Sequence, residues 1–111
     1  MQAHNNRYLL SGDVDPLALV QAHGAPLYVY DGEMMRQQYQ RMTTAFAKVK
    51  RLKINYACKA LTNINVLRLF RSLGSGLDTV SIQEVELGLM AGFAPHDIIY
   101  TPNCVSFEEV R

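Results

Sequence analysis

One lysine stands where parallel α/β proteins carry out their chemistry. Lys59 directly follows the short, mostly apolar run at residues 52–58, which is typical of a strand buried on both faces. It therefore stands at the carboxyl end of that strand, where ligands bind in such folds. A lysine whose ammonium form is destabilised by burial offers a neutral amine, which forms a Schiff base with an aldehyde. The alternative is a surface lysine whose stem lies along the protein while its charge stays in water.

A carboxylate in the next predicted strand is the second candidate. Asp78 lies within residues 77–80, which are otherwise apolar apart from Thr79, and a buried carboxylate is costly unless it is paired. Neighbouring parallel strands would bring the ends of residues 52–59 and 77–81 side by side, so that Lys59 and Asp78 could share one pocket. Asp78 could equally cap a turn or accept a hydrogen bond from a nearby backbone N–H.

The other polar candidates indicate turns and surfaces. Residues 74–76 precede a strand, at the end opposite to the expected site, and are typical of a turn between a helix and a strand. Asn103 follows the last predicted strand on the active-site side, although Pro102 and Asn103 are also ordinary turn residues. We expect no metal site and two reduced thiols, because the histidines and cysteines lack ligand spacing: His4, His23, His96, Cys58 and Cys104.

The elements that must position Lys59 and Asp78 alternate between helix and strand. Residues 27–30 are mostly β-branched or aromatic, which predicts a first strand. Beyond residue 31, the apolar residues recur with helical spacing in some segments and form short continuous runs in others. The predicted order is a helix at 31–49, a strand at 52–58, a helix at 63–73, a strand at 77–80, a helix at 82–91, a strand at 98–100 and the start of a helix at 106.

Capping residues mark where these helices begin and end. Asp or Asn before a helix accepts hydrogen bonds from its first backbone N–H groups, and the S-x-x-E capping box does so reciprocally. Glycine just after a helix allows the left-handed conformation that closes it. The predicted caps are Asp31, Asn63, Ser81 with Glu84, and Ser106 with Glu109, and the closing glycines are Gly74 and Gly92.

This order of elements is typical of parallel βα units, which build either a doubly wound sheet or a (β/α)8 barrel. Three parallel strands can neither cover both faces of their sheet nor close on themselves, and a barrel takes about 250 residues. We therefore expect these 111 residues to be the beginning of a larger fold, truncated after about three βα units.

Composition excludes several other classes of protein. Eleven Lys and Arg against ten Asp and Glu leave a net charge of +1, so no overall field favours nucleic acid or an anionic membrane. No apolar stretch approaches the roughly 18 to 20 residues that cross a bilayer, and the first residues lack an apolar signal core. With 49% hydrophobic residues the chain is typical of globular proteins, and we expect a cytoplasmic one that binds neither membrane nor nucleic acid.

Four stretches, in order along the chain, resemble one family. They are P-L-Y-V-Y-D at 26–31, Y-A-C-K-A at 56–60, G-L-D-T-V-S at 76–81 with Glu84, and A-G-F at 91–93. Together they closely resemble the N-terminal part of the diaminopimelate decarboxylases. They are more distantly similar to the ornithine and arginine decarboxylases of the same alanine-racemase-like fold. Residues 1–23 add little to the resemblance.

The resemblance implies a fold, a cofactor and residue roles. The family fold is a (β/α)8 TIM barrel that binds pyridoxal 5′-phosphate, packed against a β domain to which an N-terminal strand contributes. Residues 1–30, with the strand at 27–30, would belong to that β domain, and residues 31–111 would begin the barrel. By the same resemblance, Lys59 binds the cofactor aldehyde, Ala57 packs near the cofactor ring, and Asp78 is the acidic residue near the lysine. Family members are commonly homodimers.

The implied function is the decarboxylation of meso-diaminopimelate to L-lysine and CO₂, a lyase reaction of lysine biosynthesis on a small amino-acid substrate. One alternative is an ornithine or arginine decarboxylase, or an amino-acid racemase, of the same fold. The other is a cofactor-free binding module or inactive fragment. We expect the isolated 111 residues to be inactive, because the loops that commonly hold the phosphate follow later strands of such barrels.

Three positions depart from the family pattern. Cys58 replaces the commoner valine or isoleucine, while Leu61 and Thr62 replace the polar residues usual after the lysine. By strand alternation Cys58 should point away from Lys59, toward the covering helices. The change at residues 61 and 62 could alter the substrate preference.

Overall fold

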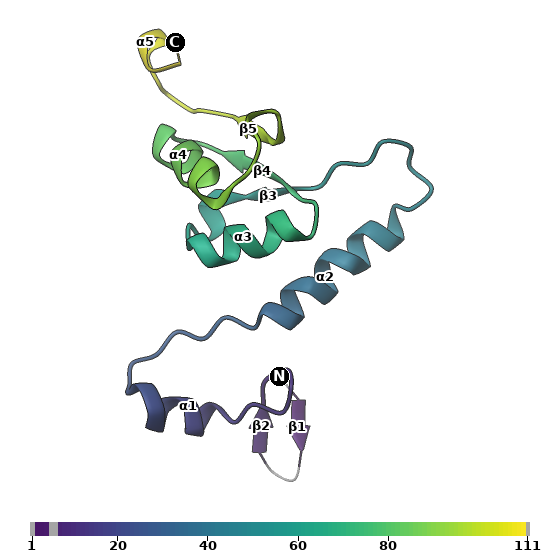
Figure 1. Cartoon of the computed structure of the whole chain (residues 1–111), viewed down its shortest axis with the longest axis vertical. Coiled ribbons are helices and arrows are strands. Elements are labelled where there is room, and N and C mark those ends of the chain that lie inside the picture. The colour runs from purple at the N-terminus through teal and green to yellow at the C-terminus, as the bar shows by residue number, and fades with distance from the viewer. Residues whose placement is uncertain (1, 5–6, 111) are drawn as a thin grey trace. The chain divides into compact units, whose positions relative to one another are not determined.

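The computed structural model describes residues 2–4 and 7–110, with the side chains of residues 8–108. It divides into two compact units, Met1–Gln38 and Tyr39–Arg111, each of which is described by itself. Figure 1 traces the chain from the strands and helix of the first unit to the three-stranded sheet of the second. Among the described residues, no helix is both long and apolar enough to cross a bilayer.

The first unit contains elements for which the sequence analysis made no prediction. Strands β1 (Gln2–His4) and β2 (Arg7–Leu9) pair antiparallel, and helix α1 (Pro16–His23) follows. The helix had recognisable signals, because Asp15 accepts a hydrogen bond from the Leu17 N–H at 2.8 Å and Pro16 occupies the first turn. Gly24 ends it at a φ of 83°.

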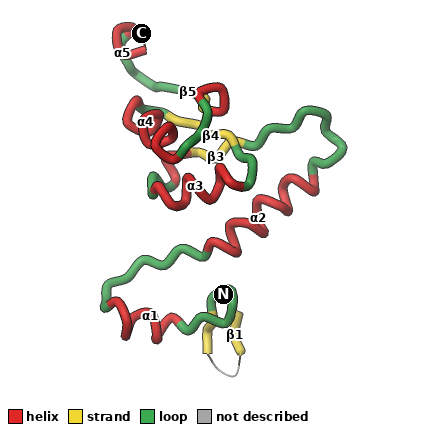
Figure 2. The backbone as a smooth tube through the Cα atoms, in the orientation of Figure 1, coloured by secondary structure: helices red, strands yellow, loops and turns green. Residues whose placement is uncertain are grey.

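The strand predicted at residues 27–30 does not form. These residues are exposed and have no helix or strand assignment, and the same segment is drawn as a loop in Figure 2. A strand exists only where a second strand accepts and donates its backbone hydrogen bonds. No described segment pairs with residues 27–30, so their β-branched and aromatic side chains alone were insufficient evidence.

The predicted cap of the following helix is confirmed. Helix α2 (Gly32–Ala45) begins after Asp31, whose carboxylate accepts hydrogen bonds from the N–H groups of Met34 and Ser11, each at 3.0 Å. The Met34 bond, followed by the Ser11 bonds, lowers the pKa of Asp31 to about 2. The helix ends four residues before the predicted end at 49, and residues 46–51 form turns.

The second unit is a parallel α/β sheet, as predicted. Its strand order is β3-β4-β5, and both pairs are parallel. Its elements are β3 (Asn55–Ala57), the 3-10 helix η1 (Cys58–Ala60), α3 (Ile64–Ser72), β4 (Gly76–Thr79), α4 (Ile82–Ala91), the 3-10 helix η2 (Pro95–Asp97), β5 (Ile98–Tyr100) and α5 (Phe107–Val110).

Helices α3 and α4 contact each other and cover one face of this sheet. The row Tyr56, Leu77 and Ile98 packs into their core, whose buried members are Cys58, Leu67, Leu77, Ala91 and Phe93. The other face, which we call the open face, carries the row Ala57, Asp78 and Ile99. The prediction that β3 is buried on both faces was wrong, because all three of its residues are half-buried.

Local capping signals account for the helix boundaries. Asn63 accepts from the Asn65 N–H at 2.9 Å, and Ser81 accepts from the Glu84 N–H at 3.3 Å. The Glu84 carboxylate accepts from the Val80 N–H at 2.8 Å, one residue before the position that a capping box would use. Gly74 and Gly92 have φ values of 84° and 91°, in the left-handed region that favours glycine. The described residues end within the first turn of α5, where the side chain of Glu109 is not described.

Candidate active site

The carboxyl edge of the sheet holds the predicted lysine. Strand β3 ends at Ala57, and the chain turns at once into η1, in which Cys58 is fully buried while Lys59 and Ala60 are exposed. The Leu61 N–H closes this turn by donating to the Cys58 carbonyl at 3.1 Å. The backbone of Lys59 therefore directly follows a buried residue, while Lys59 itself is exposed. Among the described residues, this lysine is in no ion pair.

Asp78 lies on the open face, directly beside Ala57 on the neighbouring strand. Its Oδ1 accepts a hydrogen bond from the Thr101 hydroxyl at 2.8 Å. Thr101 follows β5, and its N–H donates to the Thr79 carbonyl at 2.8 Å, which continues the ladder past the last strand residue. The partner of Asp78 is thus a neutral hydroxyl rather than the backbone N–H that we considered.

The structure brings Ala57 and Asp78 together and places the turn of Lys59 next to them. Their Cα atoms are register partners, and η1 contacts β4. Within the described residues, however, Lys59 and Asp78 form no ion pair. Their sharing of one pocket remains a prediction.

Cys58 belongs to the core, as strand alternation predicted. It has no exposed surface and packs with Leu67, Leu77, Ala91 and Phe93. Burial raises the pKa of its thiol to about 11, and the Glu84 carboxylate adds to the increase. Both cysteines, Cys58 and Cys104, are free thiols. The residue next to Lys59 is therefore a packing residue, not a second nucleophile.

Most of the chain matches a known protein family. Residues 33–111 match the pyridoxal-dependent decarboxylases, over their pyridoxal binding domain. The chain belongs to this family. The match begins at the second residue of α2 and includes the whole sheet with Ala57, Lys59 and Asp78.

Individual members of the family are similar over most of the chain. The diaminopimelate decarboxylase of Methanothermobacter thermautotrophicus is 40% identical over 100% of the chain, and that of Helicobacter pylori is 40% identical over 75%. The crystal structure of the Methanocaldococcus jannaschii diaminopimelate decarboxylase covers 98% of the chain at a TM-score of 0.90 and 29% identity. A second structure of that protein is a co-complex with L-lysine. The chain spans about a quarter of these relatives, 26% of the first and third and 20% of the second.

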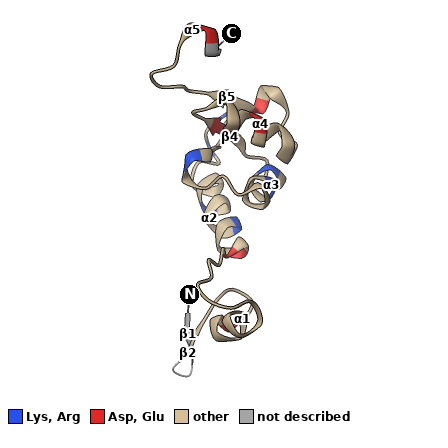
Figure 3. Cartoon of the chain, turned by 90° about the vertical axis from the view of Figure 1, so that its left-hand side faces the viewer, with Lys and Arg blue, Asp and Glu red and all other residues tan. Residues whose placement is uncertain are grey.

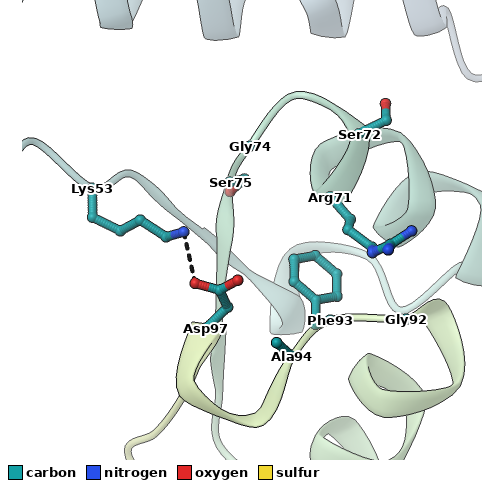
Figure 4. Close-up of a pocket in the computed structure, with 9 residues that line it drawn as sticks. All are labelled: Lys53, Arg71, Ser72, Gly74, Ser75, Gly92, Phe93, Ala94 and Asp97. Carbon is teal, nitrogen blue, oxygen red and sulfur yellow. Dashed lines mark hydrogen bonds and ion pairs between the residues drawn. The ribbon is translucent and has the colours of Figure 1, made fainter.

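The amino edge of the sheet, opposite to the edge that carries Lys59, holds a cavity of about 360 Å³. Figure 4 shows Lys53 and Asp97 in an ion pair at one side, joined at 2.8 Å, and Arg71 at the other. Its backbone donors close helices, since the N–H groups of Gly74 and Ser75 donate to the last turn of α3. The Ser75 hydroxyl also contacts backbone carbonyls, Ile54 at 3.0 Å and Gly76 at 2.7 Å. Several polar groups that line this cavity are therefore already paired within the protein.

Two residues at the carboxyl edge, Thr101 and Tyr56, were not predicted from the sequence. Thr101 could have been found by strand alternation, because it lies two residues after Ile99, the register partner of Asp78. Tyr56 was read only as an apolar strand residue of the Y-A-C-K stretch. Its hydroxyl donates to the Leu61 carbonyl at 3.2 Å, across the turn that carries Lys59.

Proposed function

We propose that this chain forms the amino-terminal part of a pyridoxal-phosphate-dependent decarboxylase that converts meso-diaminopimelate to L-lysine and CO₂. The observation that carries the proposal is an exposed lysine at the carboxyl edge of a parallel sheet, within the residues that match the pyridoxal binding domain. Relatives named diaminopimelate decarboxylase, one of them crystallised with L-lysine, favour this substrate among amino acids.

The residues at this edge fit pyridoxal phosphate. Lys59 offers an exposed primary amine outside any described ion pair, and the small side chain of Ala57 leaves room for a flat ring beside Asp78. When bound, the cofactor supplies an aldehyde for the amine and a ring that accepts an electron pair from the substrate. The phosphate would be held elsewhere, as in barrels whose last two strand loops bind phosphate.

Each of the three residues has a distinct proposed role. Lys59 holds the cofactor through Nζ and, once the substrate amine has taken its place, carries a proton to or from the substrate. Once the substrate amine has released the lysine, Asp78 would orient the free amine or favour its charged form, because opposite charges attract most strongly away from bulk water. Ala57 packs near the ring and excludes water from it.

The wider assembly is proposed from the same family membership. Residues 31–111 would begin a (β/α)8 barrel, since their three parallel strands are each followed by a helix. Residues 1–30 would belong to a β domain. We infer a cytoplasmic homodimer that takes a small amino acid. Helix α3 carries arginines and the adjacent helix α4 carries glutamates (Figure 3). This mixture of positive and negative charge does not favour a nucleic-acid surface.

A second substrate class follows from the breadth of the family match. The matched description names pyridoxal-dependent decarboxylases in general, so decarboxylation of ornithine or arginine is the competing function. Leu61 and Thr62, which replace the usual polar residues beside Lys59, are the positions at which this preference would be set.

Covalent trapping tests the proposal in the intact protein that contains these residues. Pyridoxal phosphate is added, the mixture is reduced with borohydride, and the modified peptide is located by mass spectrometry. We expect the label on Lys59 and its loss in Lys59→Ala. Lys53→Ala is the matched control, because Lys53 lies at the opposite edge of the same sheet in an ion pair with Asp97.

Substrate supply then separates the two reactions. Diaminopimelate, ornithine and arginine are offered separately, and CO₂ and the amine products are measured. L-lysine formed only from diaminopimelate supports the proposal, and turnover of ornithine or arginine instead would establish the competing function. Equal labelling of wild type and Lys59→Ala would refute the assignment of the lysine.

A further inference from the structure

The turn that carries Lys59 is fixed by its neighbours rather than by the lysine itself. In η1 the side chains of Lys59 and Ala60 are exposed, while the residues at the two ends of the turn are anchored. Leu61 is held through both of its backbone groups. Its N–H donates to the Cys58 carbonyl at 3.1 Å, and its carbonyl accepts from the Tyr56 hydroxyl at 3.2 Å.

Tyr56 is itself held in place by the helix layer. Its ring stacks on Phe70 of α3, with ring centroids 4.2 Å apart and an interplanar angle of 13°. Tyr39 of α2 meets the same Phe70 edge-on, at 6.3 Å and 69°. Burial raises the pKa of Tyr56, and the nearby Cys58 adds to this, so the phenol keeps its proton and remains a donor at neutral pH.

We propose that Tyr56 is a positioning residue for Lys59. Its hydroxyl connects the helix-packed strand β3 to Leu61 and so fixes the backbone of the turn between them. The inference rests on the proposed function, because it assumes that Lys59 carries the cofactor. A lysine has a long, flexible side chain, so its backbone is the part that the protein can preorganise.

The hydroxyl, rather than the ring, is the group that the inference concerns. Phenylalanine at position 56 would retain the stacking on Phe70 and the packing of β3, but would leave the Leu61 carbonyl to water. The effect should therefore be local to the turn. Cys58 remains buried and the Leu61 N–H keeps its acceptor, so one of the two anchors of Leu61 survives.

The first test compares amide hydrogen exchange in Tyr56→Phe and Tyr39→Phe in the intact protein. Tyr39→Phe is the matched control, because it removes a phenol from the same aromatic cluster without touching Leu61. Loss of an ordinary hydrogen bond corresponds to roughly a three- to tenfold change in a local opening equilibrium. We expect the Leu61 amide to exchange faster by that factor in Tyr56→Phe and at the wild-type rate in Tyr39→Phe. Unchanged exchange in both variants would overturn the inference.

The second readout is the rate at which pyridoxal phosphate becomes reducibly attached to Lys59. We expect this rate to fall by about the same three- to tenfold in Tyr56→Phe. The unfolding midpoint of Tyr56→Phe should be similar to that of Tyr39→Phe. If pyridoxal phosphate attached to Lys59 at the same rate in wild type and in Tyr56→Phe, the positioning role of Tyr56 would be overturned and the proposed function would remain. Absence of attachment in wild type would instead refute the proposed function, whereas the exchange of Leu61 would still report on the hydrogen bond.

Discussion

The two edges of the three-stranded sheet each carry a lysine and an aspartate, but the pairs are arranged in opposite ways. At the amino edge, Lys53 and Asp97 form an ion pair at 2.8 Å. At the carboxyl edge, Asp78 accepts from the Thr101 hydroxyl, and Lys59 is in no described ion pair. The amino edge thus carries a paired lysine and aspartate, whereas the carboxyl edge carries a lysine and an aspartate that do not pair with each other among the described residues.

This difference separates a structural pair from a site available for chemistry. A lysine in an ion pair has its charge compensated and its amine occupied, whereas an unpaired lysine retains its donors for a ligand. A neutral hydroxyl orients a carboxylate without cancelling its charge. The sequence distinguishes the two lysines by the end of the strand that each flanks, but it does not predict their ion pairs, because these depend on what the rest of the sheet places beside them.

Truncating a core side chain should have the largest effect on stability, because the same core supports both edges of the sheet. Leu77 is fully buried in β4, between the two edges. We expect Leu77→Ala to lower the free energy of unfolding by about 2–5 kcal/mol, the usual result for a large-to-small change in a core. Chemical denaturation measures this. Leu89→Ala is the matched control, because Leu89 is 46% exposed on α4, and a loss as large there would contradict the assigned core.

The two cysteines should differ in their reactivity toward a thiol reagent. Cys58 adjoins Lys59 but is fully buried, with its pKa raised from 9.0 to about 11, whereas Cys104 is exposed. A rise of that size alone lowers the thiolate fraction roughly a hundredfold. We expect a disulfide reagent at pH 8 to modify Cys104 rapidly and Cys58 only after unfolding. Rapid labelling of both in the native chain would show that η1 opens freely.

Most elements that are specified by nearby residues were predicted correctly, whereas an element that needs a distant partner was not. Helices α3 and α4 were predicted because their signals are local, such as Asn63 and Ser81 before the first turn and Gly74 and Gly92 after the last. Strands β3, β4 and β5 coincide in part with the predicted runs because continuous apolar residues separate these helices. Strand β3 is shorter than predicted, at Asn55–Ala57 rather than 52–58, and β4 lies at Gly76–Thr79 rather than 77–80. The strand at 27–30 failed because its existence depends on a partner that the local sequence does not specify.

The candidate site was predictable in position but not in its contacts. Lys59 and Asp78 could be placed at this edge because both lie at or near the carboxyl ends of their strands, and strand order follows from the alternation of elements. Their roles remain predictions. The Thr101 and Tyr56 hydrogen bonds were not, since each depends on where one hydroxyl points within the folded unit. Helix α1 was a different failure, because Asp15, Pro16 and Gly24 are local signals that were overlooked.

Removing a helix cap at the carboxyl edge should have a moderate effect. The Ser81 side chain accepts from the Glu84 N–H at the start of α4. We expect Ser81→Ala to lower the free energy of unfolding by about 0.5–2 kcal/mol, the range for loss of such a cap. Gln83→Ala, an exposed substitution in the same turn, should change it by less than about 0.5 kcal/mol. An equal effect of both variants would show that the cap does not stabilise this edge.

The ion pair at the amino edge should have the smallest effect, visible in acid. The hydrogen bond from Lys53, with lesser charge effects of Lys53 and His96, lowers the pKa of Asp97 below its ordinary value of 3.8. Because the folded pKa is depressed, the stabilisation is present above the ordinary value and is lost as pH falls through the folded one. Lys53→Met should therefore lose less stability in acid than wild type does. The measurement is the unfolding midpoint of both proteins across that pH range.

Two other lysine variants serve as controls for the effect of Lys53 in acid. Lys48→Met removes an exposed charge from the turns before β3 and should retain the wild-type acid dependence. Salt should reduce the effect of Lys53, since the screening length falls from about 8 Å at 0.15 M to about 3 Å at 1 M. Lys59→Met should also retain the wild-type dependence, because no described carboxylate pairs with Lys59. If Lys59→Met instead weakened the acid dependence as Lys53→Met does, both lysines would be paired, and the contrast between the edges would be wrong.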